Sequence, residues 1–132
     1  MALRFEFDPV NKILLLRIDG PLTEELLLQA QPEIRKHSTE TDARSGMFDF
    51  SAVTEFALST AFIRLLAKQE PSMADAATRP RIIIAPTVEA FGLSRMFQIM
   101  GEETRPLLQV VRSLEDVLSA LGAHAPHFES LD

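Results

Sequence analysis

The first residues of the chain carry the alternating pattern of a β-strand. Residues 3–7 read LRFEF, so every second side chain is apolar, which is the period of a strand with one buried face. A turn-like DPVNK sequence follows at residues 8–12. Residues 13–18 then form a second, almost wholly apolar run that ends at Asp19-Gly20-Pro21. The pattern predicts an antiparallel pair of strands within residues 3–18.

Four later segments have helical periodicity, and each begins at a residue whose hydroxyl suits a helix N-terminus. These residues are Thr23, Ser59, Thr87 and Ser113. Such a hydroxyl accepts a hydrogen bond from a backbone N–H of the first turn that has no partner within the helix. We expect helices over about residues 24–37, 60–69, 88–100 and 114–121. Pro32 lies within the first and predicts either a kink or a new first turn.

Three short apolar runs between these helices predict further strands, over Gly46–Phe50, Arg81–Ala85 and Leu107–Val111. Residues 81–85 are almost wholly apolar and β-branched and lie between two prolines, which is typical of a central strand buried on both faces. Residues 51–58 are predicted to be a connection. Residues 123–132 are predicted to be a flexible tail.

The order of these elements is ββαβαβαβα. Strands that alternate with helices need crossover connections, which predicts an α/β fold with four helices and a five-stranded, mostly parallel sheet that begins with an antiparallel strand. The length of 132 residues suits a single domain, which we place at residues 1–122.

The composition narrows the functional classes. The chain has no cysteine, which excludes disulfides, thiolate nucleophiles and Cys-ligated zinc. Its formal net charge of −6 would repel a phosphate backbone, so we expect no nucleic-acid partner. No apolar run approaches the roughly 18 residues of a membrane span, and the first residues lack the layout of a signal peptide. We therefore expect a cytoplasmic protein without a membrane span.

The sequence lacks the motifs of catalysis. It has no Gly-rich phosphate loop, no Gly-x-Ser-x-Gly elbow and no His-Glu-x-x-His. The three histidines, His37, His124 and His127, do not have the spacing of a metal site. The sequence therefore predicts a protein that is not an enzyme and that needs no metal or cofactor.

Two stretches resemble a known family. The order of elements, together with DFSAVT at residues 49–54 followed by Leu58-Ser59, resembles the STAS domain shared by anti-sigma-factor antagonists and the cytoplasmic tails of sulfate transporters. FGLSRMF at residues 91–97 looks like the Gly-x-x-Arg-Met-aromatic signature of SpoIIAA-like stand-alone STAS proteins, a group also likened to SEC14-type lipid-binding domains. The resemblance covers about Leu3 to Gly122 and implies a STAS fold and a regulatory role exercised through protein partners.

Ser59 is the candidate regulatory site. Antagonists of this family carry an Ile-Asp-Ser-Ser-Gly stretch whose second serine is phosphorylated by a partner kinase, and an ungapped overlay places that serine on Ser59. The same overlay puts Ala57 on the acidic position, Leu58 on the first serine and Thr60 on the glycine. Thr60 is a second candidate for phosphorylation. An ordinary helix-capping role for Ser59 is the alternative.

Other candidate binding residues come from the same two stretches. Asp49 and Ser51 lie near the carboxyl end of a predicted parallel strand, the edge at which open α/β sheets bind ligands, or Asp49 simply fixes the turn into Ser51. Gly92 within a predicted helix favours a close approach to the sheet. Arg95 is expected either to bind a carboxylate or phosphate of a partner or ligand, or to form an ion pair with Glu102, Glu103 or Asp49.

A set of polarizable apolar side chains suggests a ligand pocket as an alternative function. Phe62, Phe91, Met96 and Met100 are the candidates to line it, and the alternative is that they belong to a solid core.

Two functional hypotheses follow. The first is a non-catalytic STAS-like module that binds a protein partner, such as a regulatory kinase or a sigma-factor regulator, or a second copy of itself as a homodimer, with regulation at Ser59. The second is a binder or carrier of a small hydrophobic ligand held between helices and sheet. A hydrolase is a third interpretation, for which the sequence offers no constellation of catalytic residues.

Overall fold

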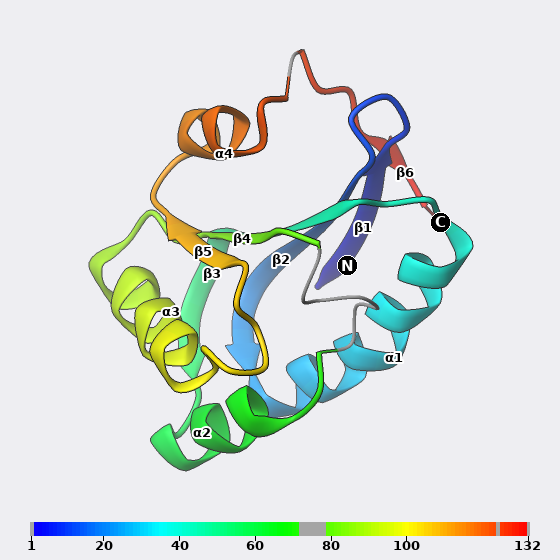
Figure 1. Ribbon diagram of the computed structural model, residues 1–132. Coiled ribbons are helices and arrows are strands. Elements are labelled where there is room, and N and C mark those ends of the chain that lie inside the picture. The colour runs from blue at the N-terminus through cyan, green and yellow to red at the C-terminus, as the bar shows by residue number, and fades with distance from the viewer. Residues whose placement is uncertain (1, 72–78, 124, 132) are drawn as a thin grey trace.

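The computed structural model describes residues 2–71, 79–123 and 125–131 of the chain. Within these residues the chain forms one sheet and four helices (Figure 1). The strands are β1 Leu3–Asp8, β2 Ile13–Thr23, β3 Ser45–Ala57, β4 Arg81–Ile84, β5 Leu108–Val111 and β6 Glu129–Ser130. The helices are α1 Glu24–Glu40, α2 Thr60–Lys68, α3 Val88–Met100 and α4 Leu114–Leu121.

The sheet has the order β5-β4-β3-β2-β1-β6. Strands β2, β3, β4 and β5 pair in parallel, whereas β1 pairs antiparallel with both β2 and β6. The prediction of a mostly parallel sheet with an antiparallel beginning is therefore confirmed. The central position of the 81–85 run is confirmed as well, because β4 lies between β3 and β5 and is buried at every residue.

The four predicted caps are confirmed. The hydroxyl oxygens of Thr23, Ser59 and Thr87 accept hydrogen bonds from the backbone N–H three residues later, at 3.0–3.1 Å. Ser113 makes the same bond at 3.3 Å. The helix α1 runs through Pro32 without interruption, so Pro32 does not begin a new helix, and α1 ends three residues later than predicted.

Two strands are longer than predicted. Asp19-Gly20-Pro21 does not end β2, and residues 51–57 are not a connection, because both segments continue as a parallel pair as far as Thr23 and Ala57. Two register shifts in this pair and the positive φ of Gly20, 84°, accommodate the break that the sequence suggested. Bulges of this kind let a strand continue with a stronger twist.

The end of the chain was also predicted wrongly. Residues 123–132 were expected to be a flexible tail, but Glu129–Ser130 form the sixth strand against β1. The backbone N–H of Leu131 donates to the carbonyl of Phe5 at 3.0 Å, and Phe128 packs on a buried cluster beneath α4. A strand of two residues is too short to show the alternation of polar and apolar side chains from which a strand is predicted.

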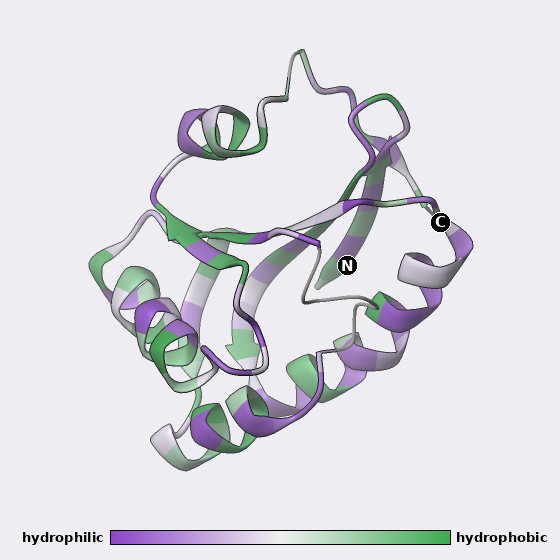
Figure 2. Cartoon of the chain, viewed as in Figure 1, coloured by the Kyte–Doolittle hydropathy of each residue, from purple (hydrophilic) through white to green (hydrophobic). Residues whose placement is uncertain are grey.

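The sheet has two buried faces. Ile13, Leu15, Met47 and Ile82 pack with Val117 of α4 on one face. Helices α1, α2 and α3 lie on the other side, as Figure 1 shows. Figure 2 shows polar and apolar segments alternating along α1 and α2, as expected for helices with one apolar face.

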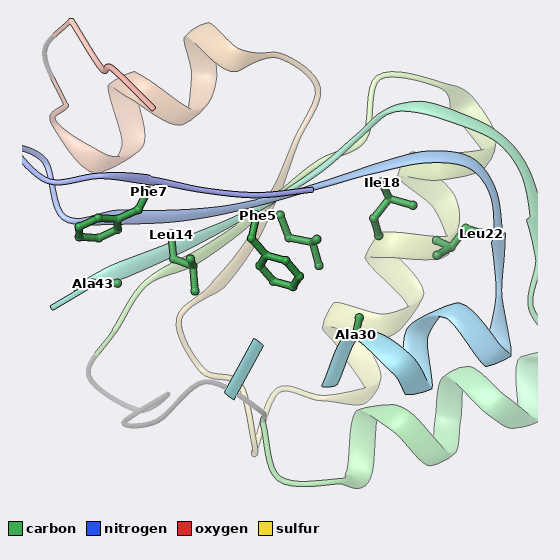
Figure 3. Close-up of a cluster of buried hydrophobic side chains, with 8 residues drawn as sticks. Phe5, Phe7, Leu14, Ile18, Leu22, Ala30 and Ala43 are labelled. Carbon is green, nitrogen blue, oxygen red and sulfur yellow. The ribbon is translucent and has the colours of Figure 1, made fainter. Parts of the chain in front are cut away.

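The face toward α1 holds the largest cluster of buried side chains. Phe5 and Leu14 of the antiparallel pair, Ile18 and Leu22 further along β2, and Ala30 of α1 belong to it (Figure 3). The labelled strand side chains in Figure 3 point from the sheet to the side on which α1 lies. This cluster adjoins the cavity described next, because Ile18, Leu22 and Ala30 belong to both.

Candidate functional site

An apolar cavity of about 140 Å³ lies between the sheet and helices α1, α2 and α3. Its lining is almost entirely aliphatic and aromatic, with Ile18, Phe48 and Ile83 from the sheet and Ala30, Ile63 and Phe97 from the three helices among its residues. Protein interiors normally pack without voids larger than a water molecule. The described residues therefore leave a partly open apolar pocket of this size between the sheet and the helices.

Two arginines interrupt the apolar lining. Arg81 and Arg105 both border the cavity, together with the uncharged polar residues Gln31 and Ser94. No acidic side chain is among the residues that border it in the described part of the chain. Charged side chains are seldom buried without an oppositely charged partner. The cavity thus has an apolar wall and a positively charged region.

Arg81 is the more unusual of the two. Its side chain is 3% exposed, and its Nε and Nη2 atoms have no hydrogen-bond partner among the described residues. Burial, and to a smaller extent the charge of Arg105, lower the pKa of Arg81 to about 10. The guanidinium therefore stays charged at neutral pH, while its Nε and Nη2 donors have no acceptor among the described residues.

Arg105 is held by the backbone. Its Nη1 donates to the carbonyl oxygens of Ala67 at 2.9 Å and Gln69 at 3.1 Å, and its guanidinium carbon lies 4.8 Å from the ring centroid of Phe97. Burial lowers the pKa of Arg105. The carbonyl contacts fix the side chain but supply no full negative charge, so both arginines lack an anionic partner within the described residues.

The period of β4 explains why Arg81 lies on this face. Successive side chains of a strand point to opposite faces, so Arg81 and Ile83 share one face and Ile82 and Ile84 the other. Ile82 and Ile84 pack in the cluster beneath α4, whereas Arg81 and Ile83 border the cavity. The register places Arg81 beside Leu108 of β5, another residue of the lining.

The phosphorylation candidates lie at a separate place, where β3 leads into α2. Ser59 is exposed, and its hydroxyl oxygen accepts a hydrogen bond from the backbone N–H of Phe62 at 3.0 Å. The backbone N–H of Ser59 donates to the carboxylate of Glu24 at 2.9 Å. Thr60 is exposed as well and is the first residue of α2.

Asp49 and Ser51 belong to an ion-pair network on the sheet. The Asp49 carboxylate pairs with Arg17 at 2.9 Å and accepts a hydrogen bond from the Ser51 backbone N–H at 2.9 Å. Arg17 also pairs with Glu6 at 2.7 Å. This bond is the one expected if Asp49 fixed a turn into Ser51, but no turn follows, because β3 continues to Ala57. Asp49 alternates with Phe48 along β3, and Phe48 borders the cavity, so Asp49 points to the opposite face.

The structure contradicts the expectation for Gly92, and Arg95 forms a different contact from those predicted. Gly92 is exposed, and a Cβ at this position would meet no atom within 4 Å, so it does not approach the sheet closely. Arg95 is exposed and donates to the side-chain oxygen of Gln98, whereas Asp49 pairs with Arg17. Arg95 is thus held within its own helix.

The expected pocket residues do not border the cavity. Phe62, Phe91, Met96 and Met100 are half-buried, but other residues of the same helices, among them Ile63, Leu93 and Phe97, form its wall. Phe91 instead lies beneath the guanidinium of Arg112, at 4.3 Å. Helices α2 and α3 are present as expected. The size and type of a side chain suggested which residues would face the cavity, but these properties do not determine which face of a helix points to it.

Sequence reasoning missed both arginines. A signal for Arg81 was present, because a charged residue opened a run that was expected to be buried on both faces. No such signal marked Arg105, whose burial depends on contacts with the end of α2, some 40 residues earlier.

Among residues 2–71, 79–123 and 125–131, no group of three or more His, Cys, Asp or Glu side chains is arranged to hold a metal ion. None of the described helices combines the length and the hydrophobicity that a bilayer crossing requires.

Comparison with solved structures identifies the fold. The anti-sigma factor antagonist SpoIIAA in its unphosphorylated form superposes with a TM-score of 0.61 and 14% identity, over 93% of this chain and 99% of that one. This chain has a SpoIIAA-like STAS fold. The Bacillus cell fate determinant SpoIIAA in its phosphorylated form superposes with a TM-score of 0.56 and 14% identity, over 91% of this chain and 99% of that one. No family model and no curated protein matches the sequence.

Proposed function

We propose that this protein is a non-catalytic regulatory module that binds a protein partner through the surface around Ser59, and that phosphorylation of Ser59 weakens this binding. The observation that carries the proposal is the position of Ser59, exposed at the start of α2 in a SpoIIAA-like fold. The fold is shared with an anti-sigma factor antagonist that has been solved both with and without phosphate.

The local geometry suits a phosphorylated residue. A phosphate on the Ser59 oxygen would lie at the N-terminus of α2, where backbone N–H groups and the helix dipole favour an anion. The first turn of α2 contains no acidic side chain that would oppose it. Ser59 is an exposed residue that precedes the first turn of α2, so a kinase can approach it without unfolding the helix.

The same geometry explains how phosphate would change the surface. Glu24 accepts a hydrogen bond from the Ser59 backbone N–H, so a phosphate of nearly two negative charges would be formed beside an existing carboxylate. Repulsion between the two would weaken the link between α1 and α2. Leu65 of the same helix is 58% exposed, so the surface that α2 offers to a partner has an apolar part as well as this charged end.

The test requires the partner in purified form. Affinity capture on wild-type protein from its own cells, followed by purification of the captured protein, allows the two to be titrated by calorimetry. We expect Ser59→Asp to weaken binding and Ser59→Ala to leave it within about twofold of wild type, because alanine adds no charge. Equal affinities for the three proteins would refute regulation at Ser59. If the captured protein is a second copy of this chain, the partner is the chain itself and the complex is a homodimer.

A second function is favoured by the cavity. We infer that the module also binds a small apolar molecule between the sheet and helices α1, α2 and α3. An apolar cavity of comparable volume, about 150 Å³, is known to stay dry and to bind benzene. The cavity of about 140 Å³ is therefore large enough for a body of similar size.

Native mass spectrometry tests this second function. Protein purified without denaturation should carry an added mass that disappears after unfolding and refolding. Ala30→Leu should remove the added mass, because Ala30 is buried in the wall and a larger side chain would occupy the void. An unmodified protein mass in wild type and variant alike would count against a bound ligand.

A further inference from the structure

The polar end of the cavity is a charged region to which the described residues supply no counter-charge. Arg81 is 3% exposed and borders the cavity, and two of its guanidinium nitrogens have no hydrogen-bond partner among the described residues. Arg105, 8% exposed, borders the same cavity, and the acceptors that its guanidinium has among the described residues are uncharged oxygens.

Such an arrangement is unfavourable in an empty protein. A buried cation without a paired anion has lost its hydration and gained no equivalent interaction. Two cations near each other add repulsion, which contributes to the lowered pKa of Arg81. An anion placed between them would receive charge-assisted hydrogen bonds from donors that are already desolvated and oriented.

We propose that the cavity binds a small molecule with an apolar body and one anionic head, a carboxylate or a phosphate, and that Arg81 and Arg105 hold the head. This inference rests on the ligand-binding function proposed above and adds the chemistry of the ligand. The unused Nε and Nη2 atoms of Arg81 lie on one edge of the guanidinium, the edge that binds two oxygens of a carboxylate or phosphate at once.

The volume limits the ligand. A cavity of about 140 Å³ compares with one known to hold benzene, so an apolar body of about six carbons fits. Among the described residues of the lining, Gln31 and Ser94 are the uncharged polar side chains that could meet further polar groups on that body. Molecules with a single polar end are therefore favoured over sugars or nucleotides.

The experiment compares probes that share a body and differ in the head. Hexanoate, hexyl phosphate and 1-hexanol are titrated into ¹⁵N-labelled protein, with acetate and inorganic phosphate as heads without a body. We expect hexanoate or hexyl phosphate to bind about tenfold or more tightly than 1-hexanol, since hydrogen bonds to a charged group are the stronger class. Whichever of the two anions binds more tightly identifies the head, and acetate and phosphate alone should bind more weakly than either.

Variants assign the effect to Arg81. Arg81→Met should weaken binding of the anionic probes about tenfold or more and leave 1-hexanol unchanged. Arg81→Gln, which keeps hydrogen-bond donors but not the charge, is a second variant of the same position. Arg35→Met is the matched control, because Arg35 is exposed on α1 and does not border the cavity. It should bind all probes as wild type does.

The outcomes separate the two proposals. Equal affinity for 1-hexanol and the anionic probes would overturn the anionic head and leave the apolar ligand standing. Binding of none of the three probes would overturn both. A second check is the melting temperature without ligand, which Arg81→Met should maintain or raise because it removes an unpaired buried charge. A lower value for Arg81→Met and Arg81→Gln alike would mean that the protein itself satisfies this charge, and would overturn the proposal.

Discussion

Ser59 and Glu24 join the start of α2 to the start of α1, because the Ser59 backbone N–H donates to the Glu24 carboxylate at 2.9 Å. The two residues are 35 positions apart in the sequence. Ser59 therefore has two roles at one place: its hydroxyl caps α2, and its N–H links α2 to α1. A modification of Ser59 would act on both.

The hydrogen bond between Glu24 and Ser59 predicts that Glu24 contributes more to stability than its neighbour Glu25. Glu24→Ala should lower the free energy of unfolding by about 1 kcal/mol, since it removes a hydrogen bond to a charged acceptor at a partly exposed position. Glu25→Ala is the matched control. Glu25 lies in the same first turn and has the same interaction with the helix dipole, but it is exposed and does not bind Ser59. Urea denaturation measures both, and equal losses would contradict the role of the link.

The cap predicts how substitutions of Ser59 affect stability. Ser59→Ala should cost about 1 kcal/mol, because the Phe62 N–H loses its acceptor. Ser59→Asp should lose less than Ser59→Ala, since aspartate caps as well as serine does and only the repulsion from the exposed end of Glu24 opposes it. Thermal or urea denaturation checks this. Thr60→Ala serves as the control and should change stability by less than about 0.5 kcal/mol. A large loss for Ser59→Asp would mean that its effect on binding cannot be separated from unfolding.

The open space around Gly92 predicts a stabilising substitution. Gly92→Ala should raise the free energy of unfolding by about 0.5–1 kcal/mol, because alanine favours the helix and its Cβ meets no atom within 4 Å. Gly101→Ala is the contrasting variant. A Cβ there would lie 3.2 Å from the Phe97 carbonyl oxygen and 3.4 Å from that of Ala67, so no gain is expected. Denaturation curves that rank the two variants in the opposite order would refute the geometry of α3.

The lowered pKa of Asp8 predicts that this residue contributes to the loss of stability at low pH. Burial alone would raise its pKa, but hydrogen bonds from the Asn11 side chain and from the backbone N–H groups of Asn11, Val10 and His127 outweigh this and lower it. A lowered carboxyl pKa contributes stability that is present above the unfolded value of about 3.8 and is lost as the pH falls through the folded value.

The corresponding variant is Asp8→Asn. It should destabilise the protein at pH 7 by about 1–3 kcal/mol, because an amide nitrogen cannot accept the bonds that the second oxygen accepts. Its stability should also fall less steeply than that of wild type below about pH 4. Asp42→Asn, at an exposed residue paired with Lys12, is the control and should lose less at pH 7. If the free energies of unfolding of wild type and Asp8→Asn fell in parallel at low pH, Asp8 would not be a source of the acid sensitivity.

The sequence predicted those parts of the fold that depend on local interactions. Ser59 and Thr87 cap their helices as expected, because a cap needs only its own first turn. Residues 51–58 are predicted to be a connection, yet residues 52–57 form a strand by pairing with residues 19–23. Pairing between distant segments is not encoded in the pattern of either segment alone.

The candidate site also has features that follow from local sequence signals and features that depend on packing between distant segments. The place of Ser59 followed from local signals, whereas the cavity depends on how three helices pack on the sheet. Arg81 lies in a strand predicted to be buried, but a sequence does not reveal that its charge has no anionic partner in the described part of the chain. Phe62 and Met96 were assigned to the wall by residue type, and the rotation of α2 and α3 gives that place to Ile63 and Phe97.

The most direct test of regulated docking is the dissociation constant of the purified partner for wild type and Ser59→Asp, measured by calorimetry under identical conditions. The account predicts an affinity about fivefold or more weaker for Ser59→Asp, at a melting temperature close to that of wild type. An unchanged dissociation constant, with both proteins folded, would contradict it.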